Sequence, residues 1–296
     1  MINCLSCGAR FNKSPNEENA YKCPVCQYCP QLVDGFYSWA PELAAQNENF
    51  PSESFDKLFE LEATSFWFRS RNKVILWAIN NYCSDFHSLL EIGCGTGFVL
   101  NGIRKEFLNA RISGSEIHSN GLAYASIRLP DVELMQLDAQ KLPFVDEYDV
   151  IGAFDVIEHI KEDELVLKNI YKGLKPNGIC LITVPQHMWL WSDVDKDSLH
   201  QRRYSAAELH AKLKKVGFEV VKSTSFVSLL IPLMLLARRS AKTSRRKSSP
   251  RVGLDLPPTL NKLMLLVMYI ELMLIKVGIS FPIGGSRLVI AKKIGL

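Results

Sequence analysis

Between residues 88 and 185, short apolar runs alternate with longer segments whose apolar positions recur at helical spacing. The short runs are "SLLEI", "RISGSE", "VELMQ", "YDVIGAF" and "GICLITV". Buried strands that alternate with helices are typical of a parallel sheet covered by helices on both faces. The pattern therefore predicts an α/β fold with a doubly wound sheet.

Two further strands are predicted nearer the C-terminus. The segment "AAELHAKLKKVGFEVVKSTSFV" predicts a helix that ends at Gly217 and leads into a sixth strand. The segment "SRLVIAKKI" predicts a seventh strand, so that the whole sheet has seven. Residues 226–285 lie between these two strands and form an insertion that is too long and too apolar for an ordinary loop.

The insertion contains "SLLIPLMLLA", the basic stretch "RRSAKTSRRKSSPR" and the run "NKLMLLVMYIELMLIKVGISF". A helix from Asn261 to Gly278 would be about 27 Å long, near the thickness of a bilayer core. A single crossing would separate the seventh strand from its sheet, and Glu271 and Lys276 are costly at mid-depth. We therefore expect a hairpin on or within one leaflet. A buried helical subdomain, a dimer interface and a true span are the alternatives.

The charge distribution changes this picture more than the net charge does. Seven of the 35 Lys and Arg residues lie between Arg238 and Arg251, which leaves 28 basic against 31 acidic residues elsewhere. A nearly neutral body is poorly suited to nucleic acid, whereas a basic stretch beside an apolar hairpin suits anionic headgroups. The opening "MINCLSCGAR" has no basic and apolar leader, so we expect a cytoplasmic protein, peripheral to the inner face of a membrane.

Four cysteines near the N-terminus form two CxxC pairs, Cys4 with Cys7 and Cys23 with Cys26. Each pair can place two thiolates at the tip of a turn, and two tips complete a tetrahedral Zn²⁺ shell. Four thiolates leave no open coordination position, which predicts a structural or protein-docking zinc ribbon. A redox pair and a site that is no longer filled are the alternatives, and Cys29 can replace one ligand. The other three cysteines are expected in the core: Cys83, Cys94 and Cys180.

A glycine-rich turn follows the first strand in "SLLEIGCGTGFVL" and leads into a helix. Glycines allow the backbone to approach a ligand closely, and the helix presents free N–H groups. Acids follow the next two strands, Glu116 at the end of the second and Asp138 after the third. Each feature alone also fits an ordinary turn, and a dehydrogenase is the nearest competitor, although its third glycine usually comes one residue later.

In this order the features resemble the class I S-adenosylmethionine-dependent methyltransferases, in particular the small-molecule branch that includes the ubiquinone-biosynthesis O-methyltransferases. The resemblance covers about residues 60–225 and 286–296. It implies a Rossmann-like seven-stranded sheet and S-adenosyl-L-methionine as cofactor. It implies these cofactor-binding residues: Glu91 with the turn of Gly93, Gly95 and Gly97 for the methionine end, Glu116 for the ribose, Asp138 for the adenine, and Asp155. It also suggests that the helix in "FWFRSRNKVILWAI" closes over the cofactor, while packing on the sheet edge is the alternative.

The catalytic candidates follow from the rule that ligands bind at the carboxyl ends of parallel strands. This rule selects Asp155, Glu158 and His159 after the fourth strand and His187 after the fifth, and the polar loop beyond adds His200. His159 is the first candidate for a general base and His200 the second, with a positioning role as the alternative for each. Asp155, Glu158 and His159 also resemble a cluster that holds a divalent cation in the ubiquinone O-methyltransferases, a less favoured role here.

These observations divide the chain and predict one function. The predicted parts are a zinc ribbon (1–40), a linker with cofactor-covering helices (41–84), the methyltransferase core (85–225), the insertion (226–285) and the final strand (286–296). The prediction is methyl transfer to a hydroxyl of a small-molecule or lipid-linked acceptor at the cytosolic membrane face. The alternatives are an RNA methyltransferase that docks its substrate on the ribbon, although the Asn-Pro-Pro-Tyr motif is missing, and a non-catalytic membrane scaffold.

Overall fold

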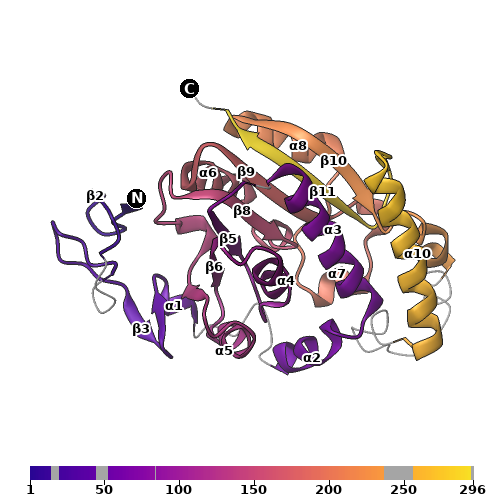
Figure 1. Cartoon of the computed structure of the whole chain (residues 1–296), viewed down its shortest axis with the longest axis horizontal. Coiled ribbons are helices and arrows are strands. Elements are labelled where there is room, and N and C mark those ends of the chain that lie inside the picture. The colour runs from indigo at the N-terminus through magenta and orange to yellow at the C-terminus, as the bar shows by residue number, and fades with distance from the viewer. Residues whose placement is uncertain (15–19, 45–52, 84, 237–255, 295–296) are drawn as a thin grey trace.

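The computed structural model of the chain describes residues 1–14, 20–44, 53–83, 85–236 and 256–294 (Figure 1). A nine-stranded sheet runs through its centre in the order β10-β11-β9-β8-β5-β6-β7-β4-β3. The strands of this sheet are β3 (Gln31–Val33), β4 (Phe36–Ser38), β5 (Ser88–Ile92), β6 (Arg111–Glu116), β7 (Glu133–Gln136), β8 (Tyr148–Phe154), β9 (Leu174–Pro185), β10 (Phe218–Phe226) and β11 (Ser286–Lys293). The N-terminal segment and helix α10 lie at opposite ends of the long axis (Figure 1).

The direction of the strands confirms the predicted topology. Strands β5 to β9 pair in parallel, with β5 in the middle between β6 and β8. Strand β11 lies between β9 and β10 and is antiparallel to both, so the last two strands pair with each other at one edge of the sheet. Because the carboxyl ends of the parallel strands meet at one edge, the loops that follow them are brought together there.

Alternate side chains of each strand supply two separate hydrophobic layers. Leu89 packs into a layer with α3, α4, α5 and α10, whereas the next residue, Leu90, packs into a layer with α6 and α8. Burial on both faces explains why β5, β8 and the second half of β9 are largely apolar. The α-helices are α1 (Pro41–Ala44), α2 (Glu53–Glu62), α3 (Phe66–Tyr82), α4 (Phe98–Glu106), α5 (Ser119–Arg128), α6 (Asp163–Gly173), α7 (Asp193–Asp197), α8 (Ala206–Val216) and α10 (Pro258–Lys276). The 3₁₀ turns are η2 (Ala139–Lys141), η3 (Ile157–His159) and η4 (Met188–Leu190).

The sheet has two strands more than the seven predicted, and both come from the N-terminal segment. Strand β4 pairs in parallel with β7, with Tyr37 opposite Met135 and Ser38 opposite Gln136, and β3 pairs with β4. Sequence spacing did not reveal them because each is only three residues long, and β4 joins the sheet through a strand almost a hundred residues away.

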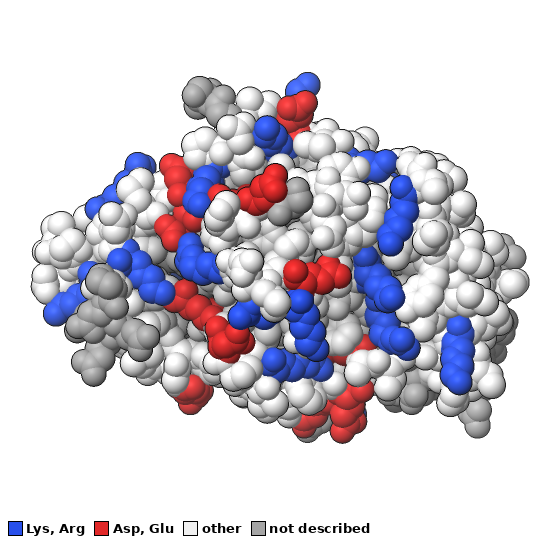
Figure 2. Space-filling model, viewed as in Figure 1, with Lys and Arg blue, Asp and Glu red and all other residues white. Residues whose placement is uncertain are grey.

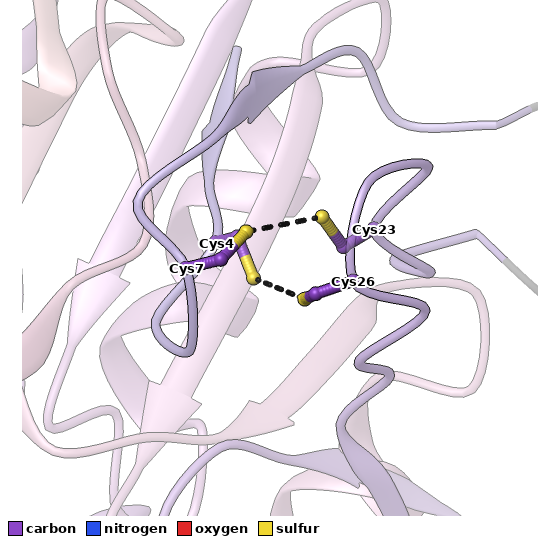
Figure 3. A group of neighbouring side chains, drawn as sticks. All are labelled: Cys4, Cys7, Cys23 and Cys26. Atoms are coloured by element: carbon purple, nitrogen blue, oxygen red, sulfur yellow. Dashed lines mark hydrogen bonds between the residues drawn. The ribbon is translucent and has the colours of Figure 1, made fainter.

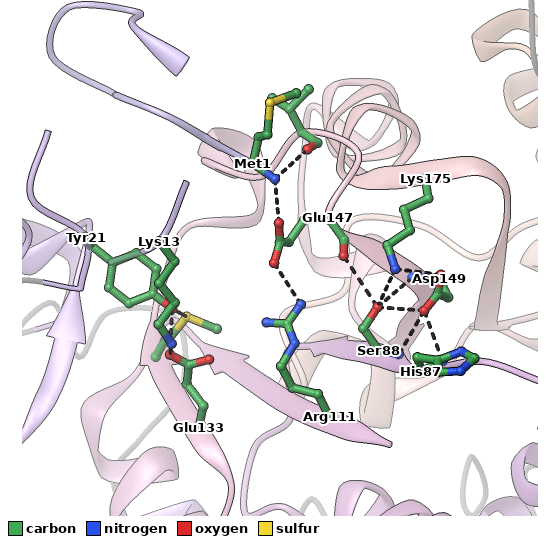
Figure 4. Close-up of polar contacts among 12 residues, drawn as sticks. Met1, Lys13, Tyr21, His87, Ser88, Arg111, Glu133, Glu147, Asp149 and Lys175 are labelled. Atoms are coloured by element: carbon green, nitrogen blue, oxygen red, sulfur yellow. Dashed lines mark hydrogen bonds and ion pairs between the residues drawn. The ribbon is translucent and has the colours of Figure 1, made fainter. Parts of the chain in front are cut away.

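Further contacts attach the N-terminal segment to residues at the start of β7 and just before β8 (Figure 4). The small sheet of β1 (Ile2–Asn3) and β2 (Arg10–Phe11) touches the core where Ile2 bridges Phe144. The terminal ammonium group of Met1 pairs with Glu147, and the hydroxyl of Tyr21 donates to Glu133 at 2.6 Å. The cysteine-bearing segment is therefore joined to the central sheet by strand pairing and by side-chain contacts.

Helix α10 confirms the helix expected in the insertion and packs beside α3, while the basic stretch 238–251 lies outside the described residues. Its buried face consists of Met264, Leu265, Met268, Glu271, Leu272 and Ile275. The carboxylate of Glu271 accepts hydrogen bonds from the backbone amides of Ser228 (2.7 Å) and Leu229 (2.8 Å). Glu271 thus stabilises the turn before the helical residues 231–236, instead of facing a lipid phase.

The outer face of α10 is an exposed apolar stripe with helical spacing: Leu263, Leu266, Ile270, Met273 and Val277. Within the described part of the chain, α10 is the one helix whose length and composition would allow it to cross a membrane. Only 28% of that stretch is buried in the protein, less than is usual for a core helix. Lys and Arg side chains lie in a row over α3 and α10 (Figure 2).

Candidate active site and candidate metal centre

The loop between β5 and α4 has the backbone that the three glycines predict. The φ angles of Gly93, Gly95 and Gly97 are 67°, 53° and 76°, values that other residues adopt at a cost. A Cβ atom on Gly93 would lie 2.5 Å from Val156, whereas one on Gly95 would meet no atom within 4 Å. Glycine is therefore required by packing at Gly93, and Gly95 borders open space at the carboxyl ends of the strands.

Glu91 is a buried acid at the end of β5. Only 2% of the residue is exposed, and its Oε2 atom has no hydrogen-bond partner among the described residues. Burial raises the pKa of Glu91 to about 8, with the nearby Glu116 adding to the effect and Arg71 opposing it. An unpartnered buried carboxyl of this kind is prepared to accept a donor from a ligand.

Glu116 and Asp138 follow the next two parallel strands. The carboxylate of Glu116 accepts the amide of Gly95 at 2.9 Å and the amides of Ile117 and His118 at 2.8 and 3.2 Å. Asp138 caps η2 by accepting the amide of Gln140 at 2.8 Å. A carboxylate offers about four acceptor positions, so Glu116 keeps capacity for a ligand hydroxyl.

Two clusters behind this loop were not anticipated from the sequence. In the first, Glu62 of α2 accepts the hydroxyl of Thr96 (2.6 Å) and pairs with Arg128 (2.6 Å). Arg128 also donates to the backbone oxygen of Thr96 at 3.2 Å, so the glycine loop is held from both sides. The segment containing Glu62 was predicted as part of the linker with cofactor-covering helices (41–84), but Glu62 itself was not singled out, because its role depends on contacts with residues far along the chain.

In the second cluster, Arg71 of α3 reaches the end of β8. Its Nη2 atom donates to the backbone oxygen of Phe154 at 2.7 Å, and its Nε atom lies 2.5 Å from Asp155. The guanidinium group also lies over the ring of Trp67, 5.1 Å from its centroid. Helix α3 therefore packs on one face of the sheet, and its N-terminal half reaches the carboxyl end of β8 through Arg71. The spacing of the segment predicted the helix but not this arginine.

The predicted acceptor side contains a cluster of Glu158, His159 and His200, whose potential ligand atoms lie within 4.8 Å of one another. The two imidazole rings meet edge to face with centroids 4.7 Å apart. Glu158 is fully buried, and neither of its carboxyl oxygens has a hydrogen-bond partner in the part of the chain that the structure describes. Burial raises the pKa of Glu158 well above the ordinary value. Burial, assisted by His200, lowers the pKa of His159 to about 4. Asp155, the third residue of the predicted cation cluster, is instead paired with Arg71.

His200 is oriented by Asp195, a residue that the sequence did not single out. The Nδ1 atom of His200 lies 2.9 Å from Oδ1 of Asp195, and Arg203 binds both oxygens of the same carboxylate at 2.6 and 3.1 Å. Although burial would raise the pKa of Asp195, hydrogen bonds from His200 and Arg203 hold it below its ordinary value. Because Asp195 is thus an ionised acceptor, Nδ1 of His200 carries a proton and Nε2 is left as an acceptor.

His187 is placed separately from this histidine pair. It follows β9 with a φ angle of 64° and stacks on Trp189 with ring centroids 5.2 Å apart. Its amide donates to the backbone oxygen of Tyr204 at 2.9 Å, and its buried Nε2 atom has no hydrogen-bond partner among the described residues. This arrangement places His187 in the loop after β9, stacked on Trp189.

The N-terminal cysteines form a candidate metal centre (Figure 3). The sulfur atoms of Cys4 and Cys26 are 3.6 Å apart, and those of Cys7 and Cys23 are 3.7 Å apart. Tetrahedral zinc with bonds of about 2.3 Å places its sulfur ligands about 3.8 Å from one another. The four thiols fit a zinc ion, and Cys29 is not part of this group.

Comparison with known proteins assigns the chain to a family. The family model described as "Methyltransferase domain" matches residues 43–223. The chain belongs to this methyltransferase family. The match includes the glycine loop, both acids that follow β6 and β7, and the Glu158, His159 and His200 cluster, and it confirms the family expected from the sequence motifs.

The curated relatives of this methyltransferase match only part of their own length. A probable S-adenosylmethionine-dependent methyltransferase of Mycolicibacterium smegmatis is 29% identical over 163 residues, 54% of this chain and 62% of that protein. A ubiquinone biosynthesis O-methyltransferase of Rickettsia bellii is 28% identical over 118 residues, 38% of this chain and 49% of that protein. The chain thus spans between about half and three fifths of the length of these relatives.

Solved structures share the fold of this methyltransferase. Phosphoethanolamine N-methyltransferase 2 of Haemonchus contortus, in complex with S-adenosyl-L-methionine, is 18% identical with a TM-score of 0.54, covering 88% of this chain and 61% of that chain. A chain in the complex between the Haloferax volcanii Trm112 methyltransferase activator and a methyltransferase is 14% identical, with a TM-score of 0.55. The match covers 86% of this chain and 98% of that chain. At these identities the likeness establishes the Rossmann-like fold alone.

The residues of the methyltransferase site fit S-adenosylmethionine. The unpartnered oxygen of Glu91 can accept the ammonium group of the methionine end, and the open space beside Gly95 leaves room for the ligand. Glu116 and Asp138 then stand at the ends of the next two strands, where ribose and adenine would lie. The donor set therefore agrees with the residue roles that the resemblance implies.

Proposed function

We propose that the protein transfers a methyl group from S-adenosylmethionine to a hydroxyl of a small-molecule or lipid-linked acceptor at the cytosolic face of a membrane. The proposal rests above all on the pair of His200 and Asp195, which supplies a proton acceptor beside the cofactor site. Support for an oxygen acceptor also comes from the relatives named ubiquinone biosynthesis O-methyltransferase and malonyl-[acyl-carrier protein] O-methyltransferase.

When bound, S-adenosylmethionine would supply a methyl group on a positively charged sulfur, and this sulfur would keep the electron pair of the broken carbon–sulfur bond. The protein must place the acceptor oxygen in line with that bond and remove its proton. His200 can take this proton at Nε2, because Asp195 holds the other ring nitrogen and stabilises the imidazolium that forms.

His159 then serves to orient the acceptor and the ring of His200. A histidine whose pKa is about 4 accepts a proton weakly at neutral pH, but it remains neutral and can form a hydrogen bond with a hydroxyl. This assignment reverses the ranking of the two histidines that the sequence suggested. Removal of the proton by His200 also prevents an oxonium product from accumulating after the carbon–oxygen bond forms.

The experiment supplies the enzyme with S-adenosylmethionine labelled in the methyl group, together with membrane lipid extract, polar metabolites or RNA in separate reactions. We expect label in the lipid or metabolite fraction and a loss of about 10²- to 10⁴-fold in His200→Gln. The affinity of that variant for S-adenosylhomocysteine should stay unchanged. Label in RNA would replace the proposed acceptor class, and cofactor binding without transfer in any reaction would favour the scaffold alternative.

The membrane part of the proposal rests on the stripe of α10. Five apolar side chains on its outer face are exposed, and Lys262 and Lys276 are exposed near its two ends. A groove of about 810 Å³ beside the stripe is lined by both Lys73 and Lys276. An apolar stripe between lysines is suited to the boundary between acyl chains and anionic headgroups, where each basic residue contributes about 1 kcal/mol.

Flotation with vesicles tests this placement. We expect the protein to float with vesicles that contain phosphatidylserine, and Ile270→Glu to abolish flotation, because Ile270 lies in the middle of the stripe. Leu165→Glu, at an exposed leucine of α6, is the matched control and should float normally. A protein that stays unbound to vesicles but sediments as a dimer, which Ile270→Glu dissociates, would show that the stripe binds a second copy instead.

A further inference from the structure

The strand that follows the zinc cysteines is part of the catalytic sheet. Strand β4 begins ten residues after Cys26 and pairs with β7 through Ser38 and Gln136. The pairing continues beyond the strand, because the amide of Trp39 donates to the backbone oxygen of Gln136 at 3.0 Å. Strand β7 leads directly to Asp138, the acid expected beside the adenine.

The side chain of Gln136 joins this strand pair to a second loop of the cofactor site. Its Oε1 atom accepts the hydroxyl of Ser38 at 2.7 Å and the amide of Ala40 at 3.1 Å. Its Nε2 atom donates to the backbone oxygens of Ala40 and Ile117, each at 2.9 Å. Gln136 is almost fully buried, and both its donors and both its acceptor positions are used.

Ile117 is the residue after Glu116, so Gln136 contacts the loop that carries the acid expected to bind the ribose. The amide of Leu137 donates to the backbone oxygen of Glu116 at 3.0 Å and ties the two loops together directly. The buried side-chain amide of Gln136 therefore bonds to the N-terminal segment on one side and to the Glu116 loop on the other. Gln136 itself lies two residues before Asp138.

We propose that Gln136 is a positioning residue through which the zinc-loaded N-terminal segment sets the affinity of the site for S-adenosylmethionine. The proposal rests on the assignment of the cofactor site made above. Zinc links Cys4 and Cys7 to Cys23 and Cys26, and this link holds the start of the segment that supplies Ser38 and Ala40. Without it, ordering β4 costs more conformational entropy.

A disordered β4 would leave the amide of Gln136 buried with fewer partners. An unpaired buried amide is unfavourable, so the side chain would turn away and release the backbone oxygen of Ile117. The Glu116 loop would then sample positions that bind the ribose less well. The cofactor would be bound more tightly when zinc is present, and by reciprocity the cofactor would strengthen zinc binding.

The test measures the dissociation constant for S-adenosylhomocysteine by calorimetry in four proteins: wild type and Gln136→Leu, each with zinc and after treatment with a chelator. Removal of zinc should weaken binding by the wild type about tenfold. Gln136→Leu with zinc should bind about as weakly, and removal of zinc from this variant should have little further effect. The interaction between the two changes is the quantity that identifies coupling through Gln136.

The control variant is Leu213→Ala, which destabilises the fold from α8, on the side of the sheet remote from β4. It should lower the melting temperature without changing the dissociation constant. Equal effects of zinc in the wild type and in Gln136→Leu would refute coupling through this residue, as would no effect in either. A zinc-loaded wild type that binds no S-adenosylhomocysteine would refute the cofactor site itself. In that case the labelled-methyl experiment would show no transfer to any fraction.

Discussion

The Nε atom of Arg71 lies 2.5 Å from the carboxylate of Asp155, which joins helix α3 to the end of strand β8. Both side chains are largely buried, and Asp155 has a φ angle of 57°, in the left-handed region that asparagine also tolerates. The N-terminal half of α3 is therefore held to the end of β8 by a charge pair. The consequences can be measured.

Removal of Arg71 should be strongly destabilising. In Arg71→Met the carboxylate of Asp155 stays in a partly buried site without its partner, and we expect unfolding to become easier by about 3 kcal/mol. The double variant Arg71→Met/Asp155→Asn should lose clearly less than the sum of its two single variants. Urea unfolding followed by circular dichroism measures each value.

A surface pair supplies the control for this measurement. Arg104 and Asp131 form an ion pair in which Asp131 is more than half exposed, so Arg104→Met should cost less than about 1 kcal/mol. Strict additivity of the Arg71 and Asp155 variants would mean that the pair contributes nothing beyond its separate side chains.

Binding of the cofactor should release a proton from Glu91. With a pKa of about 8, Glu91 is mostly protonated at pH 7 in the free protein, and the ammonium group of the ligand favours its ionised form. Affinity for S-adenosylhomocysteine should thus rise with pH between about 6 and 8. Calorimetry at pH 7 in buffers of different ionisation enthalpy detects the released proton. Glu91→Gln should show no release, whereas Glu219→Gln, at an exposed position, should behave as wild type.

His159 should make stability depend on pH below neutrality. Its pKa is about 4 in the folded protein against an ordinary value of 6.5, so the unfolded chain binds more protons between these values. Stability contributed by the neutral ring is present above pH 6.5 and is lost as the pH falls towards 4. His159→Gln should show a flatter stability profile over this window, measured by denaturant unfolding at each pH. An unchanged slope in His159→Gln together with a flatter one in His87→Gln, an exposed histidine, would contradict the assignment.

Purified protein should contain one zinc ion per chain, bound by the four clustered cysteines. Cys23→Ser removes a buried ligand and should abolish stoichiometric zinc and lower the melting temperature. Cys29→Ser should retain the ion, because Cys29 lies outside the cluster. Elemental analysis by mass spectrometry and thermal unfolding provide the two measurements. Loss of zinc in Cys29→Ser instead would show that Cys29 replaces one of the four expected ligands.

Much of this protein could be predicted because the relevant signals are local. The strand and helix pattern from residue 88 onwards, the glycine turn and the CxxC pairs each depend on neighbours within a few residues. The positions of Glu116 and Asp138 follow from the same pattern, since the ends of successive parallel strands meet at one edge of the sheet. The long helix in the insertion was also predictable from its continuous apolar run.

Contacts between distant segments were decided only by the tertiary structure. Arg71 is one polar residue on an amphipathic helix, and nothing in its spacing shows that it meets Asp155, 84 positions later. The same holds for Asp195, which orients His200 only because the loop folds back on itself. Glu271 counted against a membrane span in the sequence, but only the structure shows that it accepts the backbone amide of Ser228, 43 positions earlier.

By itself the sequence determined the family of the chain, the type and order of its elements, and the residues at the carboxyl ends of its strands. Tertiary structure decided which side chains share a site, and it joined the N-terminal segment to the sheet through β4 and Gln136. The physical reason is that propensity and periodicity act over a few residues. Strand pairing and buried hydrogen bonds depend on which distant segments are packed together when the hydrophobic core forms.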